Sequence, residues 1–245
     1  MSYLKSGVIA SSRFDLVNDL PWLFYTDMDH GVVLESNPTY VDTVTPRKGN
    51  LGVFSSSGTT NVYYESFRNG RQANTVDSGT LIAPNGSLGS ISQSYTTVNV
   101  GRFPNNVGQS FAMPFCPNIA SAYSWYINWA TGYFGDASTN YGLLSQVSSL
   151  GSTDYIAICT VNGSSSNLRL YPHAKTALNV NVTGAWYTAA SGTSGWAWGS
   201  NYSGGTAYPW LSRQAALGVL AGTQTTQAID LIYNYLSKYY DIVAT

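Results

Sequence analysis

The regular spacing of short strand-like segments constrains the fold of this 245-residue chain more than any other sequence feature. Short segments typical of strands recur along the chain, among them 61–67, 91–100, 123–129, 154–161 and 167–171, and apolar and polar residues alternate in 91–100 and 123–129. Turn-forming pairs such as Asn69-Gly70 and Asn162-Gly163 separate such segments. Many short strands with a turn signal about every 8–12 residues are typical of a β-sandwich. The pattern therefore predicts an all-β fold in which two antiparallel sheets pack together.

One segment near the C-terminus breaks this pattern. Its apolar residues recur at helical spacing, at Ile229, Ile232, Tyr233, Leu236 and Tyr240. The pair Thr225-Thr226 precedes them and supplies a helix N-cap. This spacing predicts one C-terminal helix over residues 226–240. We see no second domain boundary, so we expect one domain over residues 15–245, preceded by an unpatterned N-terminal arm at 1–14.

Charged residues are scarce, and this limits the partners that the chain can have. Asp, Glu, Lys and Arg make up 9% of the residues, with a net charge of −1, against about 25% in a typical soluble domain. A nucleic-acid partner would require a basic stripe, which the sequence lacks. No run of 18 apolar residues or secretory signal is visible, so we expect no membrane insertion and folding in a cytoplasm. A weakly charged surface also suits a subunit that buries it against neighbours.

The two cysteines, Cys116 and Cys159, lie in apolar runs and lack the spacing of metal ligands. We predict that both are buried free thiols. A disulfide between them is the alternative.

Acidic residues offer little basis for catalysis. The two glutamates, Glu35 and Glu65, lie far apart in unlike contexts, whereas glycoside hydrolysis requires a close pair of carboxylates. Asp27 and Asp29 would share one face of a strand if that strand extended so far, although a polar strand end explains them more simply. No nucleophile, phosphate-loop or zinc-protease motif occurs. We therefore expect no catalytic residues.

The sequence offers equally little basis for a metal site. Asp136, Ser138 and Asn140 alternate in the segment GDASTNY (135–141), which superficially resembles a calcium loop. This segment has one carboxylate, whereas such loops use several and a closing glutamate. We interpret it as a solvated turn and expect no cofactor; calcium is the ion that Asp136 and Asn140 would hold.

Aromatic residues crowd into the segment GWAWGSNYSGGTAYPW (195–210). Aromatic rings can stack on sugar rings while amides and hydroxyls bind sugar hydroxyls, and binding sites often lie in loops. This favours a carbohydrate site made by Trp196, Trp198, Asn201, Tyr202, Tyr208 and Trp210. The alternative is that Trp196 and Trp198, two residues apart, both point into the core.

Several segments, in order, carry a family resemblance. They are LPWLFYTDMD (20–29), VYYESFRNGRQAN (62–74), AYSWYIN (122–128), YGLLSQ (141–146), YIAICTVNGSSSNLRLY (155–171), GAWYTAA (184–190) and IDLIYNYLSKYYDI (229–242). Together they resemble the concanavalin A-like (laminin-G-like) jelly-roll sandwiches of phage and bacterial surface proteins. The chain departs from the family at 208–221, where Pro209 and Gly218 interrupt an expected strand.

This resemblance implies a protein that binds glycans, builds virions or, less often, cleaves polysaccharides. We expect a virion structural protein of a tailed phage, used for capsid or tail decoration or for attachment to a host surface. Its partners would be other virion proteins, copies of itself and a host-surface glycan. The alternatives are a free bacterial glycan-binding module and a polysaccharide-cleaving enzyme.

Overall fold

A computed structural model describes most of the chain from residue 14 onward. The described residues are 14–49, 51–57, 62–76, 80–83, 94–105, 149–162, 165–183, 197–199 and 212–245, with the strand backbones at 111–112, 115–116, 126–128, 133–136 and 139–143. Residues 1–13 of the predicted N-terminal arm lie outside this part, as does most of the aromatic segment 195–210.

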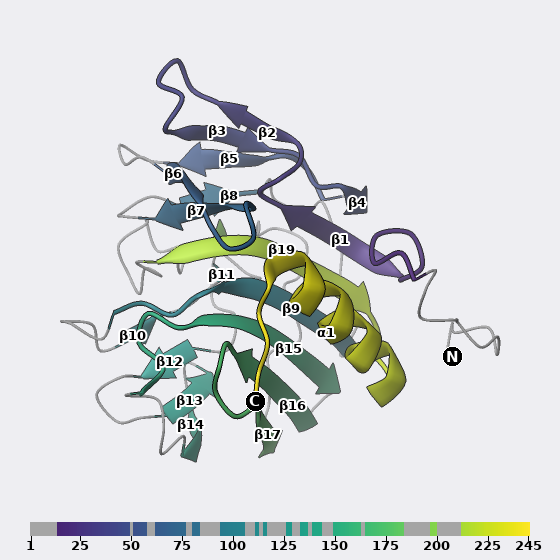
Figure 1. Cartoon of the computed structure of the whole chain (residues 1–245). Coiled ribbons are helices and arrows are strands. Elements are labelled where there is room, and N and C mark those ends of the chain that lie inside the picture. Colours follow the sequence, from purple (N-terminus) through teal and green to yellow (C-terminus); the bar gives the residue numbers. More distant parts are fainter. Residues whose placement is uncertain are drawn as a thin grey trace.

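The described strands form antiparallel sheets, as the sequence predicts (Figure 1). The largest sheet has the order β17 (Leu178–Thr183), β16 (Ser165–Pro172), β15 (Asp154–Asn162), β9 (Ser94–Arg102), β19 (Arg213–Ala221), β1 (Trp22–Asp27) and β4 (Lys48–Gly49). Two further strands join it, because β7 (Gln72–Val76) pairs with β19 and with β6 (Val62–Ser66).

The second sheet packs against the first. Its order is β11 (Phe115–Cys116), β18 (Ala197–Trp198), β8 (Thr80–Ile82), β5 (Phe54–Ser57), β3 (Val41–Val44) and β2 (Val32–Leu34). A smaller sheet contains β10 (Phe111–Ala112), β12 (Tyr126–Asn128), β13 (Tyr133–Asp136) and β14 (Thr139–Leu143).

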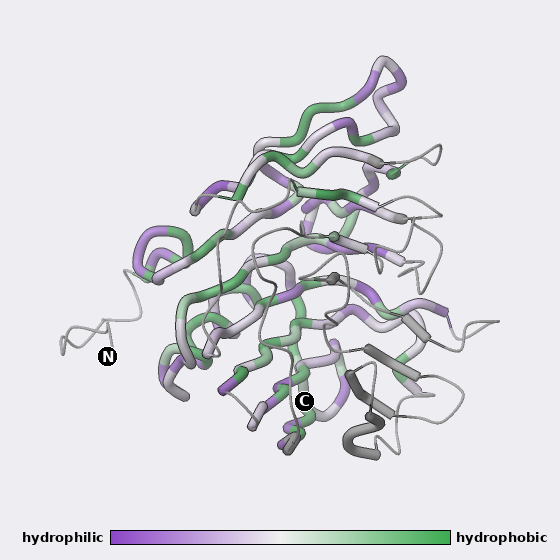
Figure 2. Tube along the Cα trace, turned by 180° about the vertical axis from the view of Figure 1, so that it is seen from behind, coloured by the Kyte–Doolittle hydropathy of each residue, from purple (hydrophilic) through white to green (hydrophobic). Residues whose placement is uncertain are grey.

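Alternation along the strands of the largest sheet creates two separate cores. On one face, residues such as Tyr155 and Leu217 pack against Phe54 and Trp198 of the second sheet. On the opposite face, residues such as Val98 and Ile156 pack against the C-terminal helix. Because neighbouring residues of a strand point to opposite faces, one sheet serves both cores. Figure 2 shows hydrophobic stretches along the strands and hydrophilic residues at several turns.

The C-terminal helix, α1 (Thr226–Tyr240), has the bounds that the sequence predicts. The Thr225 hydroxyl caps it by accepting a hydrogen bond from the Ala228 amide at 3.2 Å. Its buried residues include Ile229, Ile232, Leu236 and Tyr240, which face the largest sheet. The helix therefore covers part of that sheet, with Tyr171 of β16 packed against it, and the edge strand β17 lies beyond it (Figure 1). Among the described residues, no helix is long and apolar enough to cross a membrane.

The region 208–221, where the sequence predicts an interrupted strand, contains a nine-residue strand with a register shift between Gln214 and Ala216. It is β19, which begins at Arg213, beyond Pro209, and pairs with β1 and β9 on either side. Gly218 lies inside it because a Cβ there would come within 2.5 Å of Trp22 and 2.9 Å of Tyr25. The glycine therefore makes room for two packed aromatic rings and does not interrupt the strand.

Cys159 is a free thiol in the core between the sheets, in agreement with the prediction for that residue. Burial raises the pKa of the Cys159 thiol to about 12. The Cys116 side chain lies outside the described part of the chain.

Candidate functional site

Three asparagines join β16 to β17 on the helix side of the largest sheet. The register places Asn167 directly opposite Asn181, and Arg169 opposite Asn179. Asn167 Nδ2 donates hydrogen bonds to Asn179 Oδ1 at 2.5 Å and to Asn181 Oδ1 at 2.7 Å. Asn179 and Asn181 are exposed. We call Asn167, Asn179 and Asn181 the amide ladder.

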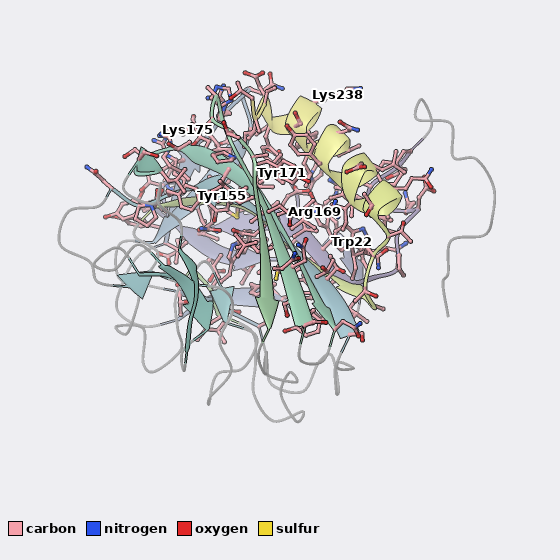
Figure 3. All side chains as sticks on the ribbon, turned by 90° about the horizontal axis from the view of Figure 1, so that it is seen from below. Trp22, Tyr155, Arg169, Tyr171, Lys175 and Lys238 are labelled. Atoms are coloured by element: carbon pink, nitrogen blue, oxygen red, sulfur yellow. The ribbon has the colours of Figure 1, made fainter. Side chains whose placement is uncertain are left out.

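Arg169 connects the amide ladder to the start of the helix. Its Nε donates to Asn167 Oδ1 at 3.3 Å, and its Nη2 donates to the Thr226 hydroxyl at 3.2 Å. Its Nη1 also lies 3.8 Å from Asp230 Oδ1. The guanidinium is thus held on the strand and on the first turn of α1, and Figure 3 shows Arg169 on the helix-facing side.

Small polar residues extend this surface across β15 and β9. Thr160 lies opposite Asn167, and its hydroxyl donates to the Asn167 carbonyl oxygen at 3.4 Å. In the next row, the Ser94 hydroxyl donates to Asn162 Oδ1 at 3.0 Å, and the Ser165 hydroxyl donates to the Asn162 carbonyl oxygen at 3.2 Å. We call the amide ladder together with Ser94, Thr160, Asn162 and Ser165 the polar face.

An aromatic pair lies on the same side of β16, two residues beyond Arg169. The ring of Tyr171 stacks on Tyr233 of the helix, with centroids 4.0 Å apart and planes 20° apart. Burial raises the pKa of the Tyr171 hydroxyl, and the neighbouring Arg169 partly offsets that rise. The pair therefore adds hydroxyl groups and aromatic carbon to one end of the polar face, and Figure 3 shows Tyr171 close to Arg169.

Ionic groups gather at the end of the largest sheet that lies away from the amide ladder. At that end Arg102 binds Asp154 at 2.6 Å, and Arg68 bridges Asp154 and Asp241 at 3.4 and 3.0 Å. By contrast, the residues of the polar face carry no charge, and Arg169 beside them is paired with an aspartate. The helix side of the sheet is thus divided into an ionic end and an uncharged end.

Asp27, one of the acidic residues considered for catalysis, has a structural environment. It ends β1, is fully buried, and its Oδ2 accepts from Arg47 Nη1 at 2.8 Å. Its Oδ1 lies 2.7 Å from His30 Nδ1. Both carboxylate oxygens are therefore engaged by cationic or polar partners, which offsets the cost of burying the charge.

Asp29 lies beyond the end of β1, so the two carboxylates do not share a strand face. Its Oδ1 accepts from the Gln72 amide at 3.0 Å, and its Oδ2 accepts from the Tyr239 hydroxyl at 2.9 Å. Arg71 lies over the Tyr239 ring, with its Cζ atom 3.8 Å from the centroid. Asp29 thus fastens the β6–β7 hairpin and the helix C-terminus to the end of β1.

The predicted carbohydrate residues are placed only in part. Trp198 is fully buried in the core, where its ring lies 6.0 Å from Phe54 at 62°. This position agrees with the alternative that Trp198 is a core residue, and it keeps the ring from a sugar. The other predicted residues, Trp196, Asn201, Tyr202, Tyr208 and Trp210, lie outside the described part of the chain.

The weak calcium candidates lie on a hairpin of the small sheet. Asp136 ends β13 opposite Thr139, and Asn140 belongs to β14 opposite Gly135. Their side chains lie outside the described part of the chain. Among the described residues, no group of three or more His, Cys, Asp or Glu side chains could hold a metal ion.

The sequence interpretation did not single out the polar face. A signal for it exists in the alternation SSNLRLY (165–171) and LNVNV (178–182), in which every second residue is polar. On a buried sheet such alternation marks one outward face. The alternation alone does not distinguish a binding face from an ordinary solvated face. That distinction depends on which polar residues of neighbouring strands lie opposite each other, and the register that decides this is not visible in the sequence.

Comparison with known proteins identifies the fold. No family model and no curated protein sequence matches the chain. Among solved structures, domain 4 of AbnA, a GH43 extracellular arabinanase from Geobacillus stearothermophilus, in complex with arabinotriose, aligns over 86% of this chain and 98% of its own. Its TM-score is 0.53 at 13% identity.

Two further solved structures belong to larger glycosidases. A GH54 α-L-arabinofuranosidase aligns over 82% of this chain at 8% identity and a TM-score of 0.56. Trypanosoma rangeli sialidase in complex with sialic acid aligns over 91% at 10% identity and a TM-score of 0.54. The chain spans 51% of the arabinofuranosidase chain and 33% of the sialidase chain. These structures are glycosidases and none is a virion protein. At such identities they establish a shared β-sandwich fold.

Proposed function

We propose that this chain is a glycan-binding β-sandwich module. The polar face is the observation that carries the proposal. Sugar hydroxyls both donate and accept hydrogen bonds, and asparagine amides offer both functions at one site. A tyrosine pair at the end of the face adds the aromatic carbon that a sugar ring can contact.

The fold comparison supports the same function. Domain 4 of the arabinanase, to which this chain is similar over nearly the whole domain, was solved in complex with arabinotriose. That complex shows a fold of this kind holding a short sugar chain. At 13% identity, the sugar bound by the arabinanase domain is not assigned to this chain, so the ligand of this chain must be found by experiment.

This proposal favours a glycan-binding module over a virion decoration protein. The same binding would serve a virion that attaches to a host glycan, but none of the similar structures above is a phage protein. Display on a virion, with other virion proteins and further copies as partners, stays a prediction from the sequence. We propose no catalytic role, because the buried Asp27 and the half-buried Asp29 are engaged in structural contacts.

A glycan screen tests the proposal directly. The purified chain is applied to an array with neutral glycans such as arabinan, xylan and β-glucan, and with acidic glycans such as polygalacturonate and sialylated oligosaccharides. Calorimetric titration then measures the affinity of each hit. We expect binding to at least one neutral glycan, unchanged by EDTA because the polar face contains no carboxylate. Absence of binding to every glycan at millimolar concentration would contradict the proposal.

A further inference from the structure

We infer that Asn179 and Asn181 are the ligand-contacting donors of the polar face and that Asn167 positions them, for a neutral oligosaccharide bound through its oxygen acceptors. This inference rests on the glycan-binding function proposed above. It follows from the direction of the hydrogen bonds in the amide ladder.

Arg169 determines which way the Asn167 amide points. A guanidinium has only donors, so the atom of Asn167 that faces Arg169 Nε, 3.3 Å away, must be the acceptor Oδ1. Asp230 and Thr226 hold Arg169 in this place. The usual ambiguity between the two orientations of an asparagine amide is thus removed by chemistry at Asn167.

The orientation of Asn167 then determines that of its two neighbours. Its Nδ2 carries two hydrogens, and the ladder uses both, one on Asn179 Oδ1 and one on Asn181 Oδ1. These two amides must therefore direct their oxygens at Asn167 and their Nδ2 groups away from it. Asn167 itself has little hydrogen-bonding capacity left for a ligand.

The result is a fixed pair of outward donor groups. Asn179 and Asn181 are exposed, and their Nδ2 groups have no hydrogen-bond partner among the described residues. Two residues apart on one strand, their Cα atoms are about 6.6 Å apart. Together they present four N–H donors in one direction, held before any ligand arrives, which lowers the entropic cost of binding.

The chemistry of these donors favours a neutral glycan. Hydroxyl, ring and glycosidic oxygens along a sugar chain are spaced acceptors that can bind such donors. An anionic glycan would require a free cation, whereas Arg169, the cation that contacts the ladder, is committed to Asp230 and to two polar partners.

Asn167→Asp is the decisive substitution. At pH 7 an aspartate only accepts hydrogen bonds, so Asn179 and Asn181 must turn their Nδ2 groups toward it and present oxygens to the ligand. The variant retains the contact with Arg169, now as an ion pair. We expect at least a tenfold loss of glycan affinity, although neither contact residue has been changed.

Gln227→Glu is the matched control. It adds the same negative charge at an exposed position in the first turn of α1, next to Thr226 and outside the polar face. We expect its glycan affinity to stay within about twofold of that of the unsubstituted chain. Equal losses in both variants would show that charge, and not amide orientation, governs binding, and would overturn the inference.

Contact and positioning are separated by two further measurements. Asn179→Ala and Asn181→Ala should each lower the affinity about tenfold, the usual effect of one lost hydrogen bond. In a nitrogen-15 NMR titration, the side-chain NH₂ signals of Asn179 and Asn181 should shift more than that of Asn167. Thermal unfolding of each variant confirms that it folds.

The outcomes distinguish this inference from the proposed function. If the unsubstituted chain binds no glycan, both fail. If it binds and the ladder variants bind equally well, the function stands and the inference fails. Loss of binding in Trp196→Ala or Trp210→Ala would then place the site in the aromatic segment 195–210.

Discussion

The buried thiol of Cys159 allows a quantitative test of the core between the sheets by alkaline titration. Burial raises its pKa from 9.0 to about 12. A folded-state pKa above the unfolded value gives stability that is complete below pH 9 and declines as the pH rises toward 12. At pH 10 the thiolate increases the statistical weight of the unfolded state by a factor of about 11. We therefore expect Cys159 to account for a loss of about 1.4 kcal/mol between pH 7 and pH 10.

Urea unfolding at both pH values measures this loss. In Cys159→Ala the thiol is absent, so the pH-dependent decrease in unfolding free energy should be smaller by about 1.4 kcal/mol than in the unsubstituted chain. Other titrating groups, including the buried Tyr155, whose pKa burial also raises, act in both proteins and cancel. Cys116→Ala controls for the second thiol. An equal decrease in the Cys159→Ala variant and the unsubstituted chain would refute the assignment of a buried, neutral thiol.

Three further substitutions test the packing, and a fourth serves as a control, each by the unfolding free energy in urea. Arg47→Ala leaves the buried Asp27 carboxylate without its guanidinium partner and should cost about 3 kcal/mol; a cost below about 1 kcal/mol would contradict the role of the pair. Ile232→Ala removes a fully buried side chain from the helix–sheet core and should cost about 3 kcal/mol, whereas a near-neutral effect would show that the helix is loosely docked. Gly49→Ala should cost well over 2 kcal/mol, because its Cβ would lie 1.9 Å from the Leu23 carbonyl oxygen. Gly70→Ala, at a similar positive φ but in open space, should cost about 1 kcal/mol, and equal costs at the two glycines would exclude the clash.

The local signals in the sequence predict the fold well where one periodicity dominates. The C-terminal helix shows a 3.6-residue pattern behind a threonine cap, and the structure has it at Thr226–Tyr240. Long strands such as β9, β15 and β16 also lie close to their predicted ranges. Such elements require only local information, because the residues that define them are neighbours in the chain.

Elements that depend on distant partners are harder to predict. Gly218 is typical of a strand break, yet it lies in the middle of β19 because Trp22 and Tyr25, about 200 residues earlier in the chain, fill the space of its missing side chain. The end of β1 also depends on a distant partner. The strand ends at Asp27, which agrees with the simpler interpretation of a polar strand end, and the buried Asp27 carboxylate contacts Arg47, 20 residues later in the chain, and His30 in the following turn.

Candidate binding residues are the least predictable, because exposure and register decide them. Trp198 lies in a segment rich in aromatics and glycine, which favours a binding loop, but pairing with β8 and β11 places it in the core. Asn167, Asn179 and Asn181 lie in ordinary alternating segments. Their significance depends on the register that sets Asn167 opposite Asn181, which the order of residues along the chain does not reveal.

The few charged side-chain contacts of this chain lie in two separate places on the helix side of the largest sheet, and their roles differ. Six of the seven contacts between basic and acidic side chains of described residues gather at the end where β1 and the β6–β7 hairpin meet the helix C-terminus. All of them except His30–Asp27, whose residues are three apart in the chain, connect distant segments, so their role is structural. The remaining pair, Arg169–Asp230, lies beside the amide ladder, where it fixes one amide orientation. Charge therefore stabilises one end of the sheet, while at the other end a single ion pair orients neutral donors. A neutral ligand meets those donors without displacing any ion pair, and we expect its affinity to change little between low and high salt.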